Sequence, residues 1–282
     1  MKKRLLSALL CVTMIASMVV GCGAPAAADT TEPAATEETT EDATEEVAGE
    51  TLTAENIKVG FVHVSDPSDM GYTYNHHEGT LTMQSVLGLS DDQIINKFNV
   101  PEGAECDTAL RELVDAGCNI IFATSFGFED YVKEVAAEYP EVQFCHATGY
   151  QAASSGLSNM HNYFASIYEA RYLAGIAAGL KTESNKLGYV AAFPFAEVIS
   201  GYTAFYLGAK SVNPDVTMEI KYTNSWNDPT VEAQVAKALI EKGCDVISQH
   251  SDSTAPATTA EDNGVWQVGY NNDMIDAAPK AS

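Results

Sequence analysis

Short apolar runs alternate with stretches of helical periodicity from residue 53 to residue 282. Runs such as Lys58 to Val62 have the length and character of buried strands, whereas the segment Ala109 to Val114 places its apolar residues at helical spacing. Gly117 and Gly243 fall where a helix should end before the next apolar run. Alternating strands and helices predict an α/β fold, with a parallel sheet covered by helices on both faces.

The same pattern occurs twice along the chain. Three pairs of segments match in the same order: Lys58 to Val62 with Lys186 to Val190, Leu113 to Ile121 with Leu239 to Ile247, and Val142 to His146 with Val265 to Gly269. Two tandem copies of one pattern predict two similar α/β lobes. We place the first lobe at residues 53–183 and the second lobe, with its crossover, at residues 184–282.

The N-terminal residues have the pattern of an export signal. A basic start, Lys2 to Arg4, precedes an uncharged apolar stretch from Leu5 to Val20, and Gly21 then precedes Cys22. This order predicts a lipoprotein signal peptide over residues 1–22, cleaved so that Cys22 becomes an acylated N-terminus and a membrane anchor. A plain signal peptide with an incidental cysteine is the alternative.

Composition changes after the cysteine. Residues 23–52 are dominated by Ala, Thr, Glu and Pro, which predicts an acidic disordered tether. The formal net charge of the whole chain is -24, and such an excess of acid argues against a nucleic-acid partner. Cys106, Cys118, Cys145 and Cys244 match no zinc or redox spacing, so we expect buried thiols and no metal or other cofactor.

The loops that follow the predicted strands combine aromatic residues with Asp, Asn, Ser and Glu. Ligands of open parallel sheets bind at the carboxyl ends of the strands, which here meet in a cleft between the lobes. These loops are 65–79, 124–128, 193–197, 225–229, 249–253 and 270–273. Aromatic faces beside polar groups suit a small aromatic heterocycle or a sugar ring.

Several of these loop residues could contact a ligand or could serve only the structure. Tyr72 and Trp226 are flanked by polar residues, which favours the cleft over the core. Glu197 either contacts a ligand or caps the helix that begins nearby. Asp228 and Pro229 form a typical helix start.

The chemistry of an enzyme is not evident in the sequence. His76, His77 and Glu78 are adjacent, whereas the zinc-peptidase pattern needs histidines one helical turn apart. Nucleophile-elbow, phosphate-loop and dinucleotide motifs are missing from the sequence. Nothing in the spacing selects a catalytic pair from carboxylates such as Asp252. We therefore predict a binding protein and not an enzyme.

The loops closely resemble those of the basic membrane protein family of ABC-transporter solute-binding lipoproteins, which includes purine-nucleoside receptors. The segments that carry the resemblance are Asp69 to Gly79, Thr124 to Phe128, His146 to Tyr150, Tyr168 to Gly175, Phe193 to Val198, Trp226 to Pro229 and Gln249 to Ser253. The resemblance runs from about residue 57 to the end of the chain.

This resemblance implies a two-lobed type I periplasmic-binding-protein fold that clamps a purine between Tyr72 and Trp226. It also implies that Asp273 holds the ribose where the ligand is a nucleoside. The full set of ligand residues that we predict is Asp69, Tyr72, Tyr74, Phe126, Glu197, Trp226, Asp252 and Asp273.

The implied partners are ABC permease subunits, and the implied location is the extracytoplasmic face of the cell membrane. Thr73 and Tyr74 replace an Asn-Gln pair of the nucleoside-binding members, which leaves both a free base and a nucleoside open. A surface receptor not coupled to transport and a binder of another ring ligand such as a sugar are the alternatives. Family members continue beyond Ser282, so we expect the chain to be C-terminally incomplete.

Overall fold

A computed structural model describes residues 51–282. The chain divides into a unit that ends at Gly49 and a second unit, Glu50–Ser282, that contains all the elements described below. The predicted signal peptide, Cys22 and nearly all of the predicted tether lie outside the described residues.

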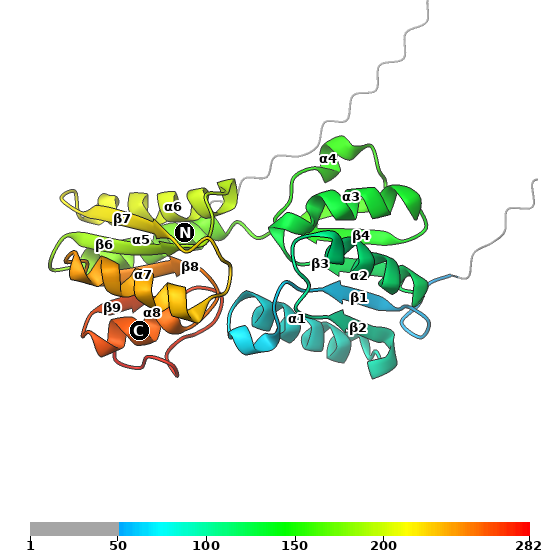
Figure 1. The fold of residues 1–282 in the computed structure, drawn as a ribbon, viewed down its shortest axis with the longest axis horizontal. Helices are drawn as coiled ribbons and strands as arrows, with labels where there is room; N and C mark the ends of the chain where they lie inside the picture. The colour runs from blue at the N-terminus through cyan, green and yellow to red at the C-terminus, as the bar shows by residue number, and fades with distance from the viewer. Residues whose placement is uncertain (1–50) are drawn as a thin grey trace, which may run out of the picture. The chain divides into compact units, whose positions relative to one another are not determined.

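The first lobe is built on a five-stranded sheet of order β2-β1-β3-β4-β5, in which every pair is parallel (Figure 1). Its strands are β1 (Val59–Val62), β2 (Ile94–Lys97), β3 (Ile120–Ala123), β4 (Gln143–Ala147) and β5 (Met160–Tyr163). Its helices are α1 (Tyr72–Leu87), α2 (Ala104–Asp115), α3 (Glu129–Glu138) and α4 (Ala152–Ser155).

Two apolar cores, one on each face, hold this sheet. On one face, Leu110 and Leu113 of α2 and Val132 of α3 pack with Ile121 and Phe144 of the sheet, and all five are fully buried. On the other face, α1 contributes Met83 to a smaller cluster around Val59 and Phe61. The amphipathic faces of α2 and α3 therefore cover the larger of the two apolar clusters of this lobe.

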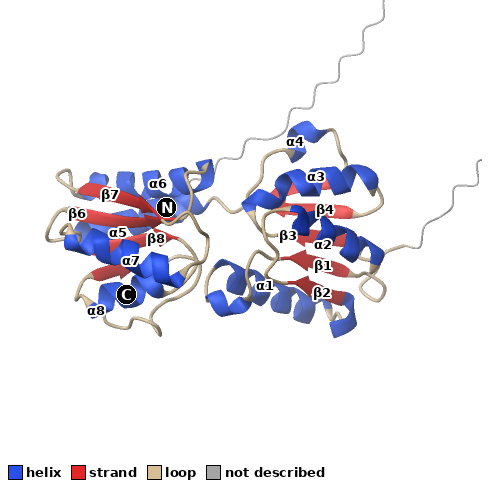
Figure 2. Cartoon of the chain, viewed as in Figure 1, coloured by secondary structure: helices blue, strands red, loops and turns tan. Residues whose placement is uncertain are grey.

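The second lobe repeats the arrangement with a four-stranded parallel sheet of order β7-β6-β8-β9 (Figure 2). Its strands are β6 (Lys186–Ala191), β7 (Thr217–Tyr222), β8 (Val246–His250) and β9 (Trp266–Val268). Its helices are α5 (Ile167–Lys181), α6 (Ala196–Val212), α7 (Pro229–Glu241) and α8 (Ala255–Asp262).

Helices cover both faces of the second sheet as well. Ala236 and Leu239 of α7 pack on one face with Ile247, and Phe205 of α6 packs on the other face with Leu187. The two parallel sheets with helices on both faces confirm the predicted fold class.

Helix α5 belongs to the second lobe, although the predicted boundary at residues 183 and 184 would assign it to the first. Ala178 of α5 lies in the core formed by β6 and α6. At Gly175 an added Cβ would overlap the backbone carbonyl of Phe205, and at Gly208 it would overlap that of Tyr172. Glycines at these crossing points let α5 and α6 pack backbone to backbone, and that contact was not readable from the repeat.

The elements end where the local sequence predicts. Gly117 and Gly243 follow α2 and α7 with φ of 83° and 91°, a left-handed conformation that favours glycine. Asp228 caps α7 by accepting a hydrogen bond from the Val231 N–H, and Pro229 occupies the first turn. Gly117 and Gly243 thus end helices before β3 and β8, and Asp228 begins α7 after β7.

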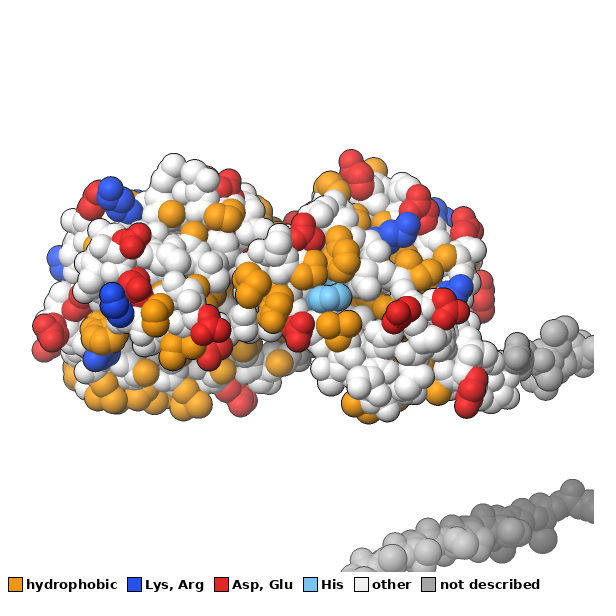
Figure 3. Space-filling model, turned by 90° about the horizontal axis from the view of Figure 1, so that it is seen from below, with side chains coloured by type: hydrophobic (Ala, Val, Ile, Leu, Met, Phe, Trp, Pro, Cys, Tyr) orange, Lys and Arg blue, Asp and Glu red, His pale blue; other side chains and the backbone are white. Residues whose placement is uncertain are grey.

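The surface of the described residues carries more acidic than basic side chains, and Figure 3 shows them scattered over both lobes on the face in view. Within residues 51–282, no helix has the length and apolarity needed to cross a bilayer.

Candidate ligand-binding site

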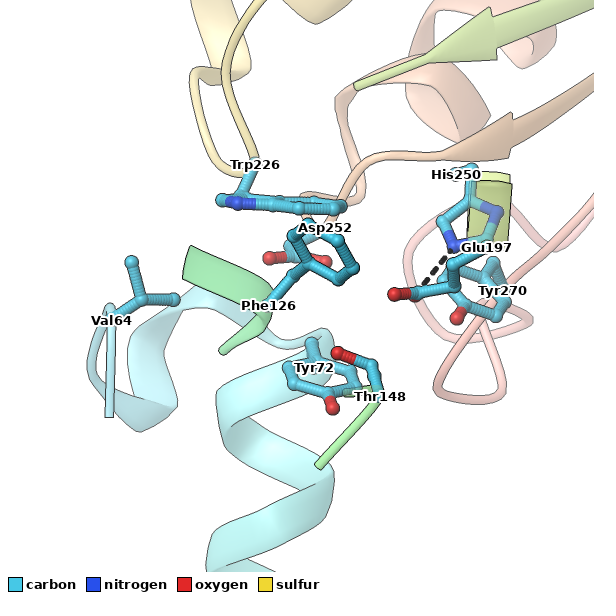
Figure 4. A pocket seen from close by; sticks show the side chains of 9 residues that line it. All are labelled: Val64, Tyr72, Phe126, Thr148, Glu197, Trp226, His250, Asp252 and Tyr270. Atoms are coloured by element: carbon cyan, nitrogen blue, oxygen red, sulfur yellow. Dashed lines mark hydrogen bonds and ion pairs between the residues drawn. The ribbon is translucent and has the colours of Figure 1, made fainter. Parts of the chain in front are cut away.

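A cavity lies where the loops at the strand ends of the two sheets meet (Figure 4). Nine side chains line it: Val64, Tyr72, Phe126, Thr148, Glu197, Trp226, His250, Asp252 and Tyr270. Four come from the first lobe and five from the second. Such a position at the carboxyl ends of parallel strands is where open α/β sheets bind ligands.

Aromatic rings form one wall of the cavity. Trp226, from the loop between β7 and α7, packs edge-on against Phe193, with ring centroids 5.1 Å apart. Phe126 of the first lobe stacks on Phe195 of the second, with centroids 4.7 Å apart and planes 21° apart. In Figure 4 the rings of Trp226 and Phe126 lie together on the side of the cavity opposite Tyr72. These contacts fix flat apolar faces toward the space.

Tyr72 is positioned by the start of α1. The buried carboxylate of Asp69 accepts hydrogen bonds from the backbone N–H groups of Gly71, Thr73 and Tyr74, at 2.9 to 3.0 Å. A carboxylate at this place satisfies N–H groups that have no partner within the helix and complements the helix dipole. Asp69 therefore orients the first turn of α1, and with it the Tyr72 ring.

Polar atoms without a partner converge on the cavity. The Tyr72 hydroxyl, the Thr148 Oγ1 and the Glu197 Oε2 are all buried, and none has a hydrogen-bond partner among residues 51–282. Buried polar groups are normally paired, because leaving one unpaired costs about 1–3 kcal/mol. Three such groups around one space provide donors and acceptors for a ligand with a polar edge.

Thr148 adopts an unusual backbone conformation. Its φ is 69°, in the left-handed region that a β-branched residue rarely occupies. The loop is held by buried Glu129, whose Oε1 accepts hydrogen bonds from the N–H groups of Tyr150 and Gln151, both at 2.6 Å. Strain of this kind costs about 1–3 kcal/mol and persists where the surroundings impose it, often at functional sites.

Burial controls the charge of two neighbouring groups in the second lobe. The Glu197 Oε1 lies 3.3 Å from the His250 Nε2. Desolvation raises the pKa of Glu197 to about 7, and the nearby Thr148 hydroxyl and Arg171 guanidinium oppose that rise. Desolvation, reinforced by Arg171, holds the pKa of His250 well below its usual value, so the imidazole is neutral. The pair therefore presents a carboxyl group that titrates near neutral pH beside a neutral ring.

Asp252 is buried among other acids. Desolvation, followed by the charges of Asp69 and Glu232, raises its pKa well above the usual range. Its Oδ1 accepts a hydrogen bond from the Asn271 side chain at 3.2 Å. Burial thus favours the protonated form of this carboxyl group, which can donate as well as accept a hydrogen bond at the cavity wall.

Arg171 of α5 supports the second lobe from behind the cavity. The guanidinium carbon lies 3.7 Å from the centroid of the Tyr270 ring and 5.7 Å from that of Tyr189. The side chain is buried, and its Nε and Nη2 have no hydrogen-bond partner in the described part of the chain. Cation–π contact thus takes the place of an ion pair and fixes the Tyr270 ring against the cavity.

The two lobes touch around the cavity rim. The Asn227 amide donates to the Ser65 hydroxyl at 3.2 Å, and the Asn75 amide donates to the Asn271 carbonyl. At Gly71 a Cβ would overlap the Asp252 carbonyl oxygen, so only glycine permits this approach. The two lobes are therefore in direct contact beside the cavity.

The structure brings five of the eight predicted ligand residues to the cavity: Tyr72, Phe126, Glu197, Trp226 and Asp252. The other three do not line it. Asp69 caps α1, and the exposed Asp273 accepts a hydrogen bond from the Ile275 N–H. Tyr74 lies two residues after Tyr72 on α1, about 200° around the helix axis, so the two side chains cannot face the same space.

Val64, Thr148, His250 and Tyr270 complete the lining and were not among the predicted residues. Each follows or ends a strand, and three of them lie in loops or segments that the sequence singles out. Position at a strand end was therefore the sequence feature that could have identified these residues. Which residue of a loop lines the cavity depends on the direction of its side chain.

Comparison with known proteins gives the family. The model of the family described as ABC transporter substrate-binding protein PnrA-like matches residues 56–282. A purine-binding protein of Brucella abortus (strain 2308) is 41% identical over 235 residues, covering 83% of this chain and 65% of that protein. A putative ABC transporter glucose-binding protein of Haloferax volcanii is 38% identical over 226 residues, covering 80% of this chain and 56% of that protein. The chain thus spans less than two thirds of the length of either relative.

Solved structures agree on the fold. An ABC transporter solute-binding protein from Aeropyrum pernix K1 superposes with a TM-score of 0.66 at 20% identity, over 76% of this chain and 62% of that one. A solute-binding protein from Conexibacter woesei superposes with a TM-score of 0.62 at 19% identity, over 79% of this chain and 74% of that one. Relatives and neighbours of this kind are solute-binding proteins and not enzymes. The chain belongs to the PnrA-like family of ABC transporter substrate-binding proteins.

Proposed function

We propose that the chain is the extracytoplasmic solute-binding component of an ABC importer and that its cavity binds a purine base or purine nucleoside. The observation that carries the proposal is the cavity itself, which combines aromatic faces with three buried polar atoms that have no partner among the described residues: the Tyr72 hydroxyl, the Thr148 Oγ1 and the Glu197 Oε2. A purine has two flat faces that stack on aromatic rings and an edge of ring nitrogens that form hydrogen bonds.

The placement of the polar groups supports a ligand with one polar edge. Trp226 and Phe126 lie on one side of the cavity, and Glu197 and His250 stand together at another (Figure 4). A ligand stacked on the first pair would direct its edge at the second. The similarity to the Brucella purine-binding protein agrees with this choice.

A sugar is the second candidate ligand, because the Haloferax relative is named as a glucose-binding protein and sugar rings also stack on tryptophan. Calorimetric titration of the purified protein with adenine, adenosine and glucose separates the candidates. Saturable binding of adenine or adenosine but not glucose is expected. Binding of glucose alone would favour the sugar, and binding of none of the three would contradict the proposal.

The proposed partners are ABC permease subunits. A receptor that binds the same ligand without feeding a transporter would have the same cavity. Uptake of radiolabelled adenine by cells with and without the gene distinguishes the two. We expect uptake to fall when the gene is deleted and to return on complementation, whereas unchanged uptake would favour the receptor.

We also propose that acylated Cys22 anchors the protein to the outer side of the cell membrane. The support is the order of basic, apolar and small residues before this cysteine. Substitution Cys22→Ser is expected to move the protein from the membrane fraction to the soluble fraction and to abolish labelling with a fatty-acid analogue. Unchanged fractionation and labelling would refute the anchor.

A further inference from the structure

Three hydrogen bonds converge on one oxygen of Glu102, in the loop between β2 and α2. Its Oε1 accepts from the Ser125 hydroxyl at 2.6 Å, from the Gly127 backbone N–H at 2.8 Å and from the Trp226 indole N–H at 3.2 Å. The first two donors belong to the first lobe, and the third belongs to the second. Glu102 is not among the side chains that line the cavity.

Within the first lobe, Glu102 fixes the loop that carries Phe126. Its two donors are the residues immediately before and after this phenylalanine. The fit is tight, because a Cβ added at Gly127 would lie 2.6 Å from the carboxyl carbon of Glu102. The carboxylate thus holds the backbone on both sides of Phe126 and limits where its ring can lie.

Across the lobes, Glu102 fixes the orientation of Trp226. The indole N–H is the only polar group of that side chain, and it can only donate. Phe193 contacts the indole ring of Trp226. The Glu102 carboxylate accepts a hydrogen bond from the indole N–H. Since β2 and β7 belong to different sheets, this hydrogen bond exists only while the lobes are together.

We propose that Glu102 is a positioning residue that aligns the Phe126 and Trp226 rings and latches the closed lobes over the ligand. The inference rests on the proposed function, because it assumes that the cavity between these rings holds the ligand. A charge-assisted hydrogen bond is stronger than a neutral one, which suits a latch that must hold a single geometry. Loss of the latch should chiefly speed ligand release, since it removes a contact of the closed state.

The first experiment needs no ligand. The sequence contains two tryptophans, so Trp266→Phe leaves Trp226 as the only one. In this background, acrylamide quenching of Trp226 fluorescence is measured in four proteins. They are the parent with Glu102 intact, the variants Glu102→Ala and Glu102→Gln, and Glu105→Ala, a substitution of an exposed neighbouring glutamate that serves as the matched control. We expect Glu102→Ala alone to raise the quenching constant, because the glutamine still offers an acceptor oxygen. Equal quenching in all four proteins would overturn the latch.

The second experiment is a double-mutant cycle on the release rate of adenine, measured by stopped flow. Glu102→Ala should speed release by about tenfold when Trp226 is present, and by much less beside Trp226→Phe, which keeps a flat face but has no N–H. Gly127→Ala, which displaces the carboxylate, should reproduce the faster release. An equal effect of Glu102→Ala in both backgrounds would mean that Glu102 only braces its own loop, and would overturn the inference.

The two experiments separate this inference from the proposed function. Failure of the unsubstituted protein to bind adenine, adenosine or glucose would count against the proposed ligands, while the quenching comparison would still decide the contact between Glu102 and Trp226. Circular dichroism of each variant verifies that it is folded.

Discussion

The two lobes share a strand order but contribute different chemistry to the cavity. The first lobe supplies Val64, Tyr72, Phe126 and Thr148, which give shape and two hydroxyl groups. The second lobe supplies Glu197, Trp226, His250, Asp252 and Tyr270, and therefore all the carboxyl and imidazole groups of the lining. The first lobe thus mainly shapes the ligand space, whereas the second lobe carries the groups whose protonation state can change.

The difference between the lobes has a physical cause in the residues that support the cavity lining on each side. Thr148 is held from behind by hydrogen bonds of Glu129 to the loop backbone, which act on geometry. Glu197 and His250 are held in a desolvated space near Arg171, which acts on charge. Substitution of Glu197 should consequently change how the stability of the protein depends on pH.

The largest expected effect is on stability and concerns Glu197. Its pKa is raised to about 7 on folding, so the folded state holds a proton that the unfolded state releases at lower pH. The resulting contribution to stability is complete below about pH 4.5, and on the order of 3 kcal/mol is lost as pH rises to about 7. Because Glu197→Gln cannot titrate, the stability difference between wild type and this variant should change by that amount over the window.

Urea unfolding of both proteins at several pH values measures this difference. The two proteins must be compared with each other, because the pKa values of buried His63 and partly buried His76 are lowered to about 4. These two histidines make stability change with pH in the opposite sense. Glu241→Gln, an exposed carboxylate of the same lobe, controls for the loss of one acid. Parallel curves for wild type and Glu197→Gln would show that the group is solvated.

The next effect concerns the aromatic wall of the second lobe. Stacking of a base on an aromatic side chain contributes about 1–3 kcal/mol, so Trp226→Ala should weaken purine binding by roughly tenfold to a hundredfold. Trp226→Phe should lose much less, because it keeps a flat face. Calorimetry on folded variants tests both. Equal affinity of wild type and Trp226→Ala would place the ligand elsewhere.

A smaller effect is expected from the hydroxyl of the first lobe. The Thr148 Oγ1 has no hydrogen-bond partner among residues 51–282, so Thr148→Val should leave the melting temperature nearly unchanged. Loss of one neutral hydrogen bond to the ligand should weaken binding by about threefold to tenfold, as measured by calorimetry. Unchanged affinity would show that this hydroxyl does not contact the ligand.

The smallest effect is expected at Asp273, which is exposed and bonded to its own loop. Asp273→Asn should change adenine and adenosine affinities by less than about twofold, as is usual for a surface substitution. A loss specific to adenosine would instead support the role in holding a ribose that the family resemblance implies, and would require this loop to move toward the ligand.

Much of the fold follows from local sequence. Strand-length apolar runs, helical spacing and left-handed glycines such as Gly117 depend on neighbouring residues, so the two α/β units can be predicted from one chain. The rule that ligands bind at the carboxyl ends of parallel strands then selects loops that line the cavity. The boundary at α5 could not be predicted in this way, because it depends on glycine contacts with α6.

Selection within those loops required the tertiary structure. Tyr72 and Tyr74 are equivalent by composition, and only the helix geometry turns the first toward the cavity. Thr148 looks unremarkable until its backbone is seen to be left-handed. Glu102 and Trp226 lie 124 residues apart and meet through a single hydrogen bond. The sequence by itself determined the two sheets and the loops that meet between them, because local periodicity encodes both. The direction of each side chain, the charge of Glu197 and the contacts between lobes depend on burial and distance across the fold, which only packing decides.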